Sequence, residues 1–236
     1  MGAGTSTGTG AGSGPLPLAV SHEQGREALL AELATWSQLL GAVDAEVLAA
    51  PSRCAGWSTG AVLVHVHQGL REVIPALRAV RGRDRPSADA ASSWARSAGR
   101  ERAAGRVEPP QAVTEPQEGH PVARLAGAVD ALAAELPHVP AGYVDFRGEV
   151  LTTGDLLATR AVELAVHHLD LDLIGSPPAA AALRLARLTC EALAGTHLPV
   201  DWDDTTAVLA GSGRVALTGA VLREHPRLQG AFPSLG

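Results

Sequence analysis

Apolar residues recur three or four positions apart along several segments of the chain, which is the spacing of an amphipathic helix. Ser21 and Gln24 form a capping box ahead of the first such segment, and Ser58 can cap the second. Pro75 predicts a kink or an early end in the second helix. Four helices of this length predict a bundle. The predicted helices span residues 21–49, 59–80, 121–136 and 153–174.

Shorter patterns fill the rest of the chain. The run VDFRGEVL, residues 144–151, has apolar residues on both sides of an Arg-Gly turn and predicts a short β-ribbon. Residues 90–102 and 179–194 can form helices, and two short β-like runs flank a Gly-Ser-Gly turn at 211–213. We therefore expect a mainly α fold, with a small C-terminal α/β appendage. The expected units are a flexible low-complexity tail at 1–19, a helical bundle at 20–176 and the appendage at 177–236.

Composition and charge narrow the possible functions. The chain has 236 residues, 46% of them hydrophobic, which is enough for a sizeable core. Its net charge of −6, with dispersed basic residues, disfavours a nucleic-acid surface. All 19 basic residues are arginine, which excludes a Schiff-base lysine and a Walker lysine. No apolar run reaches the roughly 18 residues that span a membrane. We expect a cytoplasmic protein, monomeric or weakly homo-oligomeric, without membrane partners.

Several polar residues interrupt the apolar segment RAVELAVHHLDLDL, residues 160–173. Glu163 and His167 are four residues apart and so lie on one helix face, where they can share a ligand or each other. Asp170 can accept a hydrogen bond from the imidazole, as carboxylates do beside metal-bound histidines. His168 is about 100° away around the helix and is expected at the rim or in packing. Without a third ligand, the Glu/His pair is an ordinary surface ion pair.

His65 and His67 are the candidates for a third ligand. They are two residues apart on one predicted helix, so at most one of them can face Glu163. Helical periodicity does not choose between the two.

Two motifs resemble those of the mycothiol-dependent maleylpyruvate isomerase family, in the DinB/YfiT-like superfamily. The stretch CAGWSTGAVLVHVHQGL is similar to the family's N-terminal signature, a Gly-Trp pair with the metal-binding histidine eight residues after the Trp. In this sequence that position is His65, counted from Trp57. The second motif is an Arg, a Glu three later, a His four after that and an Asp-Leu at the helix end. It is matched by Arg160, Glu163, His167, Asp170 and Leu171.

The resemblance implies a DinB-like four-helix bundle that binds a divalent metal, usually Zn2+ in this family, through His65, Glu163 and His167. Three protein ligands leave one open position, and a thiol that enters it is deprotonated by the cation. In the family this cosubstrate is mycothiol, the low-molecular-weight thiol of actinobacteria. Cys54 and Cys190 form no CxxC, in keeping with a thiol that comes from outside.

For the isomerase, the resemblance implies that the thiolate adds to the cis double bond of maleylpyruvate, the new single bond rotates, and elimination yields fumarylpyruvate. Arginine forks suit the substrate's carboxylates, and Arg214 on the GSGR turn is our candidate catalytic residue. Arg78, Arg81, Arg83 and Arg85 are further candidates. Two alternatives stay open. One is a mycothiol S-transferase that acts on an electrophilic metabolite or xenobiotic, and the other is a non-catalytic metal-binding member of the fold.

Overall fold

The structure, a computed structural model, describes residues 15–103, 120–173, 175–232 and 235. Most of the tail expected at residues 1–19 therefore lies outside the described residues, as does Ile174 at the expected end of the fourth helix. The described part of the tail is extended and bound to the body, because the Leu16 N–H donates to the Ala192 carbonyl at 2.8 Å. Within the described part of the chain, no helix has both the length and the apolar character to cross a membrane.

The structure is mainly helical, with one two-stranded sheet among the described residues. The elements are α1 (His22–Leu40), α2 (Ala45–Ala49), α3 (Thr59–Arg78), α4 (Ala90–Ala103), α5 (Pro121–Glu135), β1 (Tyr143–Phe146), β2 (Glu149–Thr152), α6 (Thr153–Asp170), α7 (Ala180–Ala194), α8 (Asp204–Gly211) and α9 (Gly219–Glu224). Two short 3-10 turns, Leu136–His138 and Pro226–Leu228, complete the list.

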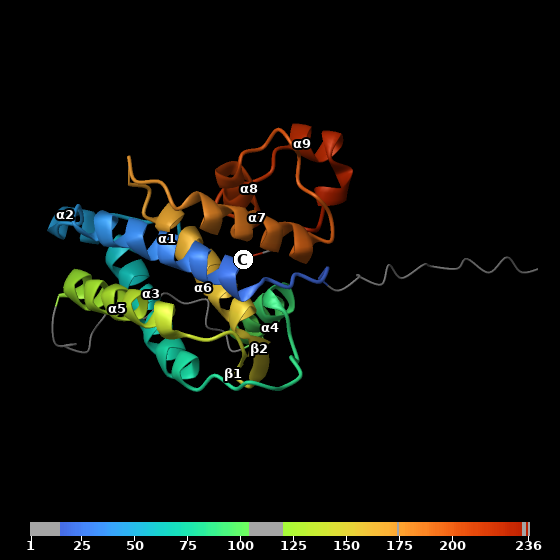
Figure 1. The fold of residues 1–236 in the computed structure, drawn as a ribbon. Coiled ribbons are helices and arrows are strands. Elements are labelled where there is room, and N and C mark those ends of the chain that lie inside the picture. Colours follow the sequence, from blue (N-terminus) through green and yellow to red (C-terminus); the bar gives the residue numbers. More distant parts are fainter. Residues whose placement is uncertain (1–14, 104–119, 174, 233–234, 236) are drawn as a thin grey trace, which may run out of the picture.

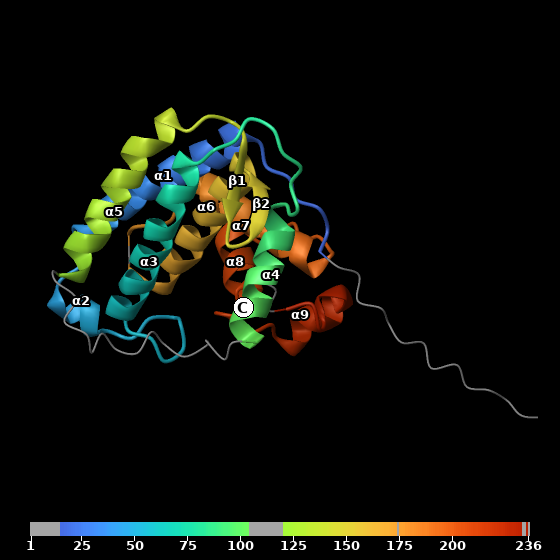
Figure 2. The same cartoon turned by 90° about the horizontal axis from the view of Figure 1, so that it is seen from below.

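The predicted bundle is confirmed, and its four long helices are α1, α3, α5 and α6. Each packs against two of the others, in the cyclic order α1, α6, α3, α5. Figure 2 shows α3 and α6 side by side, with α5 beside α3 and α1 behind them. Helix α7 lies outside this ring against α1 and α6, and carries the C-terminal region on that side (Figure 1).

The contact between α1 and α6 depends on small residues and on one buried tryptophan. A Cβ on Gly154 would lie 2.1 Å from the Val20 carbonyl oxygen, and one on Gly25 would lie 2.5 Å from the Gly154 carbonyl oxygen. Only glycine allows this approach. Farther along, the fully buried Trp36 donates its indole N–H to the Leu164 carbonyl at 3.2 Å. These contacts fix how α6 is seated in the bundle.

The predicted ribbon is also confirmed. Strands β1 and β2 pair antiparallel, with Val144 opposite Leu151 and both side chains fully buried. Arg147 and Gly148 form the turn with φ of 50° and 79°, as a tight two-residue hairpin requires. The ribbon runs directly into α6, whose N-terminus is capped by the Thr152 side chain rather than by Thr153.

Two helix boundaries differ from the prediction. The segment expected as one helix over 21–49 is broken, because α1 ends at Leu40 and Asp44 caps the separate helix α2. In contrast, Pro75 does not end α3, which continues to Arg78. Pro75 removes one backbone hydrogen bond of the helix. Only three helical residues follow it, so this loss affects only the last turn of α3.

The expectation of strands in the C-terminal region was wrong. Helix α7 forms as predicted, but the apolar run before the Gly-Ser-Gly turn is helix α8, and no strand occurs among the described residues after it. Asp203 begins α8 by accepting a hydrogen bond from the Thr206 N–H at 2.7 Å. A short apolar run fits a strand and a buried helix equally well, so capping and packing decided the outcome. The appendage is therefore small and helical.

Candidate metal centre

Three side chains from two helices meet on one side of the bundle. His65 lies near the start of α3, and Glu163 and His167 lie in the second half of the antiparallel α6. One potential ligand atom from each residue lies within 4.8 Å of the other two. His65 Nε2 is 3.6 Å from Glu163 Oε1, and the two imidazole rings have centroids 4.9 Å apart. Within the described part of the chain, no other three His, Cys, Asp or Glu side chains gather in this way.

The structure separates the two histidines of α3 that periodicity left open. His65 faces α6, packs edge-on against Trp57 and keeps 35% of its side chain exposed, so the cluster is reachable from solvent. His67 is buried and turned to α5, where Arg124 Nη2 lies 3.4 Å from its Nδ1. Burial, followed by the charges of Arg124 and Arg71, lowers the pKa of His67 and keeps the ring neutral. His67 therefore takes no part in the cluster.

Asp170 fixes the orientation of His167. Its Oδ2 lies 2.9 Å from His167 Nδ1, which leaves Nε2 as the nitrogen that can face a cation. Burial by itself would raise the pKa of Asp170, but hydrogen bonds from His167 and Arg214 outweigh burial and lower it to about 2. The carboxylate is therefore ionised and can only accept. It holds the proton of a neutral His167 on Nδ1 and the lone pair on Nε2.

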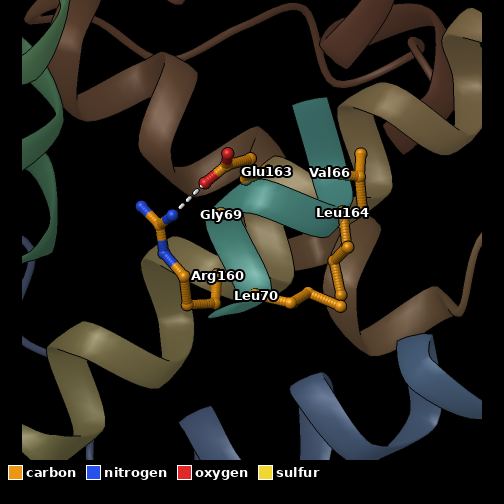
Figure 3. A pocket seen from close by; sticks show the side chains of 6 residues that line it. All are labelled: Val66, Gly69, Leu70, Arg160, Glu163 and Leu164. Atoms are coloured by element: carbon orange, nitrogen blue, oxygen red, sulfur yellow. Dashed lines mark ion pairs between the residues drawn. The ribbon is translucent and has the colours of Figure 1, made fainter. Parts of the chain in front are cut away.

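Arg160 binds the carboxylate of Glu163 within α6, one helical turn before it (Figure 3). Burial opposes the charged form of Glu163, but the Arg160 guanidinium and then His65 outweigh it and keep its pKa below the ordinary value. Gly69 of α3 lies against this pair, since a Cβ there would be 3.1 Å from Glu163 Oε1. Glu163 is therefore an anionic donor in a confined position.

The structure places Arg214, the predicted catalytic arginine, behind Asp170. Its Nε and Nη2 donate to the two carboxylate oxygens at 2.8 and 2.9 Å. Nη1 donates to the Ser212 carbonyl and Nη2 also to Cys54 Sγ, so four of its five N–H groups have protein acceptors. Burial and the charge of Asp170 raise the pKa of the Cys54 thiol, against the opposing effect of Arg214.

The other arginines proposed for the substrate lie far from the cluster. Arg78 is at the opposite end of α3 from His65, about 20 Å away at 1.5 Å per residue, and pairs with Glu135. Arg81 pairs with Asp145 beside the ribbon, and residues 83 and 85 are exposed in the same loop.

His168, expected at the rim or in packing, is buried in the core on another face of α6. Its Nδ1 lies 2.8 Å from Glu32 Oε1, and its Nε2 donates to the Ser176 carbonyl at 2.8 Å. Glu32 is fully buried and also accepts from the Ala179 N–H at 2.6 Å.

Sequence reasoning missed two residues that shape the cluster. Gly69 carries a signal, because it lies four residues after His65 and therefore on the same face of α3. Phe146 carries none, because its ring comes under Arg160 only when the ribbon folds back on α6, at 5.4 Å from the guanidinium carbon to the ring centroid.

The donor set fits a catalytic zinc ion. Two imidazoles and one carboxylate are a known ligand set of such sites, which keep a further position for water or substrate. One nitrogen of His167 and one oxygen of Glu163 are already held by Asp170 and Arg160, so the remaining donor of each is directed to the cluster.

Comparison with known proteins agrees with the two motifs. Residues 29–172, more than half of the chain, match the family model described as the mycothiol maleylpyruvate isomerase N-terminal domain. No curated protein and no solved structure matches the chain. The matched segment runs from α1 to just beyond α6 and includes every residue of the cluster. The chain therefore belongs to the mycothiol maleylpyruvate isomerase family, through its N-terminal domain.

Proposed function

We propose that the protein is a zinc- and mycothiol-dependent enzyme that catalyses the cis–trans isomerisation of a maleylpyruvate-like substrate. His65, Glu163 and His167 hold the metal. The observation that carries the proposal is the meeting of these three donors, from two helices, within 4.8 Å on a side of the bundle open to solvent. Family membership supports the thiol and the reaction class.

A bound zinc ion would lower the pKa of an incoming thiol, so that a thiolate is available at neutral pH. The chain's own residues prepare the site for it. Asp170 holds the His167 ring, Arg160 holds Glu163, and the exposed side of His65 leaves an entry for the thiol. Neither cysteine replaces that thiol, since the pKa of Cys54 is raised and Cys190 is fully buried.

In the isomerisation, the thiolate adds to the cis double bond, the resulting single bond rotates, and elimination restores the double bond in the trans form with release of the thiol. The substrate's carboxylates need cationic partners during these steps. We propose Arg214 for that role because it lies directly behind the Asp170–His167 pair. To bind a carboxylate with a full fork it must exchange part of its contact with Asp170.

A mycothiol S-transferase is the second candidate, and the state of Arg214 favours it. Four of the five N–H groups of this arginine are already bound to the protein, so it does not present a ready fork for a dicarboxylate. The same thiolate can attack an electrophilic metabolite or xenobiotic and stay attached to it.

Metal content tests the site directly. Purified wild type is expected to contain about one zinc per chain, and both His65→Ala and His167→Ala are expected to lose it. Zinc should also raise the melting temperature of the metal-free wild type but not of the variants. His67→Ala is the matched control, and it should keep the metal. A wild type that neither contains nor takes up a divalent metal would rule out the proposal.

A second experiment separates the two reactions. Maleylpyruvate absorbance is followed with and without mycothiol, and the products are analysed by mass spectrometry. Isomerisation predicts a trans product without thiol and unchanged mycothiol concentration, whereas a transferase predicts consumption of mycothiol into a thioether. Arg214→Lys is expected to raise the KM for the dicarboxylate if this arginine binds substrate.

A further inference from the structure

Arg160 has more donors than the described residues use. Its side chain is only 9% exposed, and neither Nε nor Nη1 has a directed hydrogen bond to any described residue. Nη1 lies against Glu163 Oε2 as an ion pair. Beside the two residues is a cavity of about 10 Å³, also lined by Gly69 and Leu70, which is room for about one water molecule (Figure 3).

The two oxygens of Glu163 have different surroundings. Oε2 is taken by Arg160, which approaches from one turn earlier on α6. Oε1 lies 3.6 Å from His65 Nε2. It also lies next to Gly69, which has no side chain to displace it. Only Oε1 therefore faces the cluster of potential ligands.

Arg160 itself is held from outside the bundle. Its guanidinium carbon lies 5.4 Å from the centre of the Phe146 ring, and Phe146 is buried at the end of β1. The attraction between a guanidinium and an aromatic face adds to the pairing with Glu163. The ribbon thus supports Arg160, and Arg160 in turn supports the carboxylate.

We propose that Arg160 is a positioning residue that restricts Glu163 to one-oxygen binding of the metal. A carboxylate can bind a cation through one oxygen or through both. Binding through both would use the position that a thiol needs, and the ion pair with Arg160 prevents it by occupying Oε2. Gly69 contributes by leaving space for Oε1. This inference rests on the proposed function, since it concerns the same metal site.

Cobalt binding tests the proposal without measuring activity. Co2+ is added to metal-free wild type, Arg160→Gln and Arg160→Lys, its affinity is measured against a chelator, and the visible spectrum reports the coordination number. Four-coordinate Co2+ absorbs strongly and higher coordination absorbs weakly. For Arg160→Gln we expect an affinity loss of about 10- to 100-fold and weaker absorption. Arg160→Lys keeps a cation beside Oε2 and should recover most of the strong absorption.

Arg187→Gln is the matched control. Arg187 is also buried and binds the carbonyls of Trp202 and Pro199, but it lies on α7 away from the cluster. Its loss should lower the melting temperature without changing the cobalt spectrum. If Arg160→Gln had the cobalt affinity and spectrum of wild type, the positioning role of Arg160 would be wrong, but the proposed metal site would stand. A wild type that binds no cobalt would overturn the proposed metal site as well.

Gly69→Ala provides a test that does not depend on the fold tolerating a change at Arg160. Alanine is the better helix former, and this gain offsets part of the strain that the new methyl group introduces, so we expect the variant to fold. That methyl would lie 3.1 Å from Glu163 Oε1 and 3.8 Å from Arg160 Nη1, so the pair must shift by a few tenths of an ångström. We expect cobalt affinity to fall by about tenfold, at the low end of such effects. Unchanged affinity in this variant would contradict the proposal.

Discussion

Two clusters of histidine and glutamate lie on different faces of α6, and each contains one of two consecutive histidines. The open cluster consists of His65, Glu163 and His167, and the closed cluster consists of Glu32 and His168. Both join α6 to a neighbouring helix. Their residue types are the same, yet we propose a metal for only one of them.

The difference lies in what the protein leaves available. In the closed cluster both ring nitrogens of His168 and both oxygens of Glu32 have protein partners, and the two side chains are 2% and 0% exposed. These bonds tie α1, α6 and the segment leading to α7 together. In the open cluster, supporting residues occupy one donor of His167 and one of Glu163 and leave the other facing inward. The proposed metal site is thus distinguished from the closed cluster by its partly satisfied donors rather than by residue type.

The largest expected effect comes from Glu32→Ala. It leaves the buried His168 and the Ala179 N–H without their acceptor, so we expect a loss of about 3–5 kcal/mol in the free energy of unfolding. Urea denaturation of the metal-free proteins measures this. Zinc per folded chain should be unchanged.

His167→Ala should show the opposite pattern to Glu32→Ala. It should abolish zinc binding and lower the stability of the metal-free protein less than Glu32→Ala does. If Glu32→Ala lost zinc but kept its stability, the distinction between the two clusters would be wrong.

An intermediate effect is expected for Asp170→Asn. The amide has one acceptor oxygen in place of two and carries no charge, so it holds His167 and Arg214 less firmly. Zinc affinity should fall by about 10- to 100-fold, as for other groups that orient a metal-bound histidine. Competition with a chelator gives the value. Full affinity in this variant would show that the ring is held by packing alone.

The smallest effect is expected for the alkylation of Cys54, whose Sγ accepts a hydrogen bond from Arg214 next to Asp170. Because burial and Asp170 raise the pKa of its thiol, Cys54 should stay protonated through neutral pH and react slowly with iodoacetamide, with the rate rising only at higher pH. The same protein in urea should react at the rate of an ordinary cysteine. Rapid alkylation of the folded protein near pH 7 would mean that the chain offers a reactive thiol of its own.

Much of the fold followed from local patterns. The stripes of apolar residues gave four long helices, Ser21 and Ser58 cap the helices they were expected to cap, and the Arg147-Gly148 turn joins the two strands. Each of these features depends on residues close together in the chain. The prediction of a strand in the C-terminal run near Val208 was wrong, because a helix of eight residues spans little more than two turns, too few to reveal its period.

The sequence by itself determined that Glu163 and His167 share a face of one helix, with Asp170 placed to hold the imidazole, because spacing within a helix is fixed by its geometry. It also determined the family, through two motifs that a family model then confirmed. Helical spacing did not choose between His65 and His67. The family resemblance implied His65, and only the tertiary structure brings His65 to Glu163 and His167 and places Gly69 and Phe146 around Glu163 and Arg160. The physical reason is that the rotation of α3 against α6 is set by side chains packed across the whole bundle, which no local pattern records.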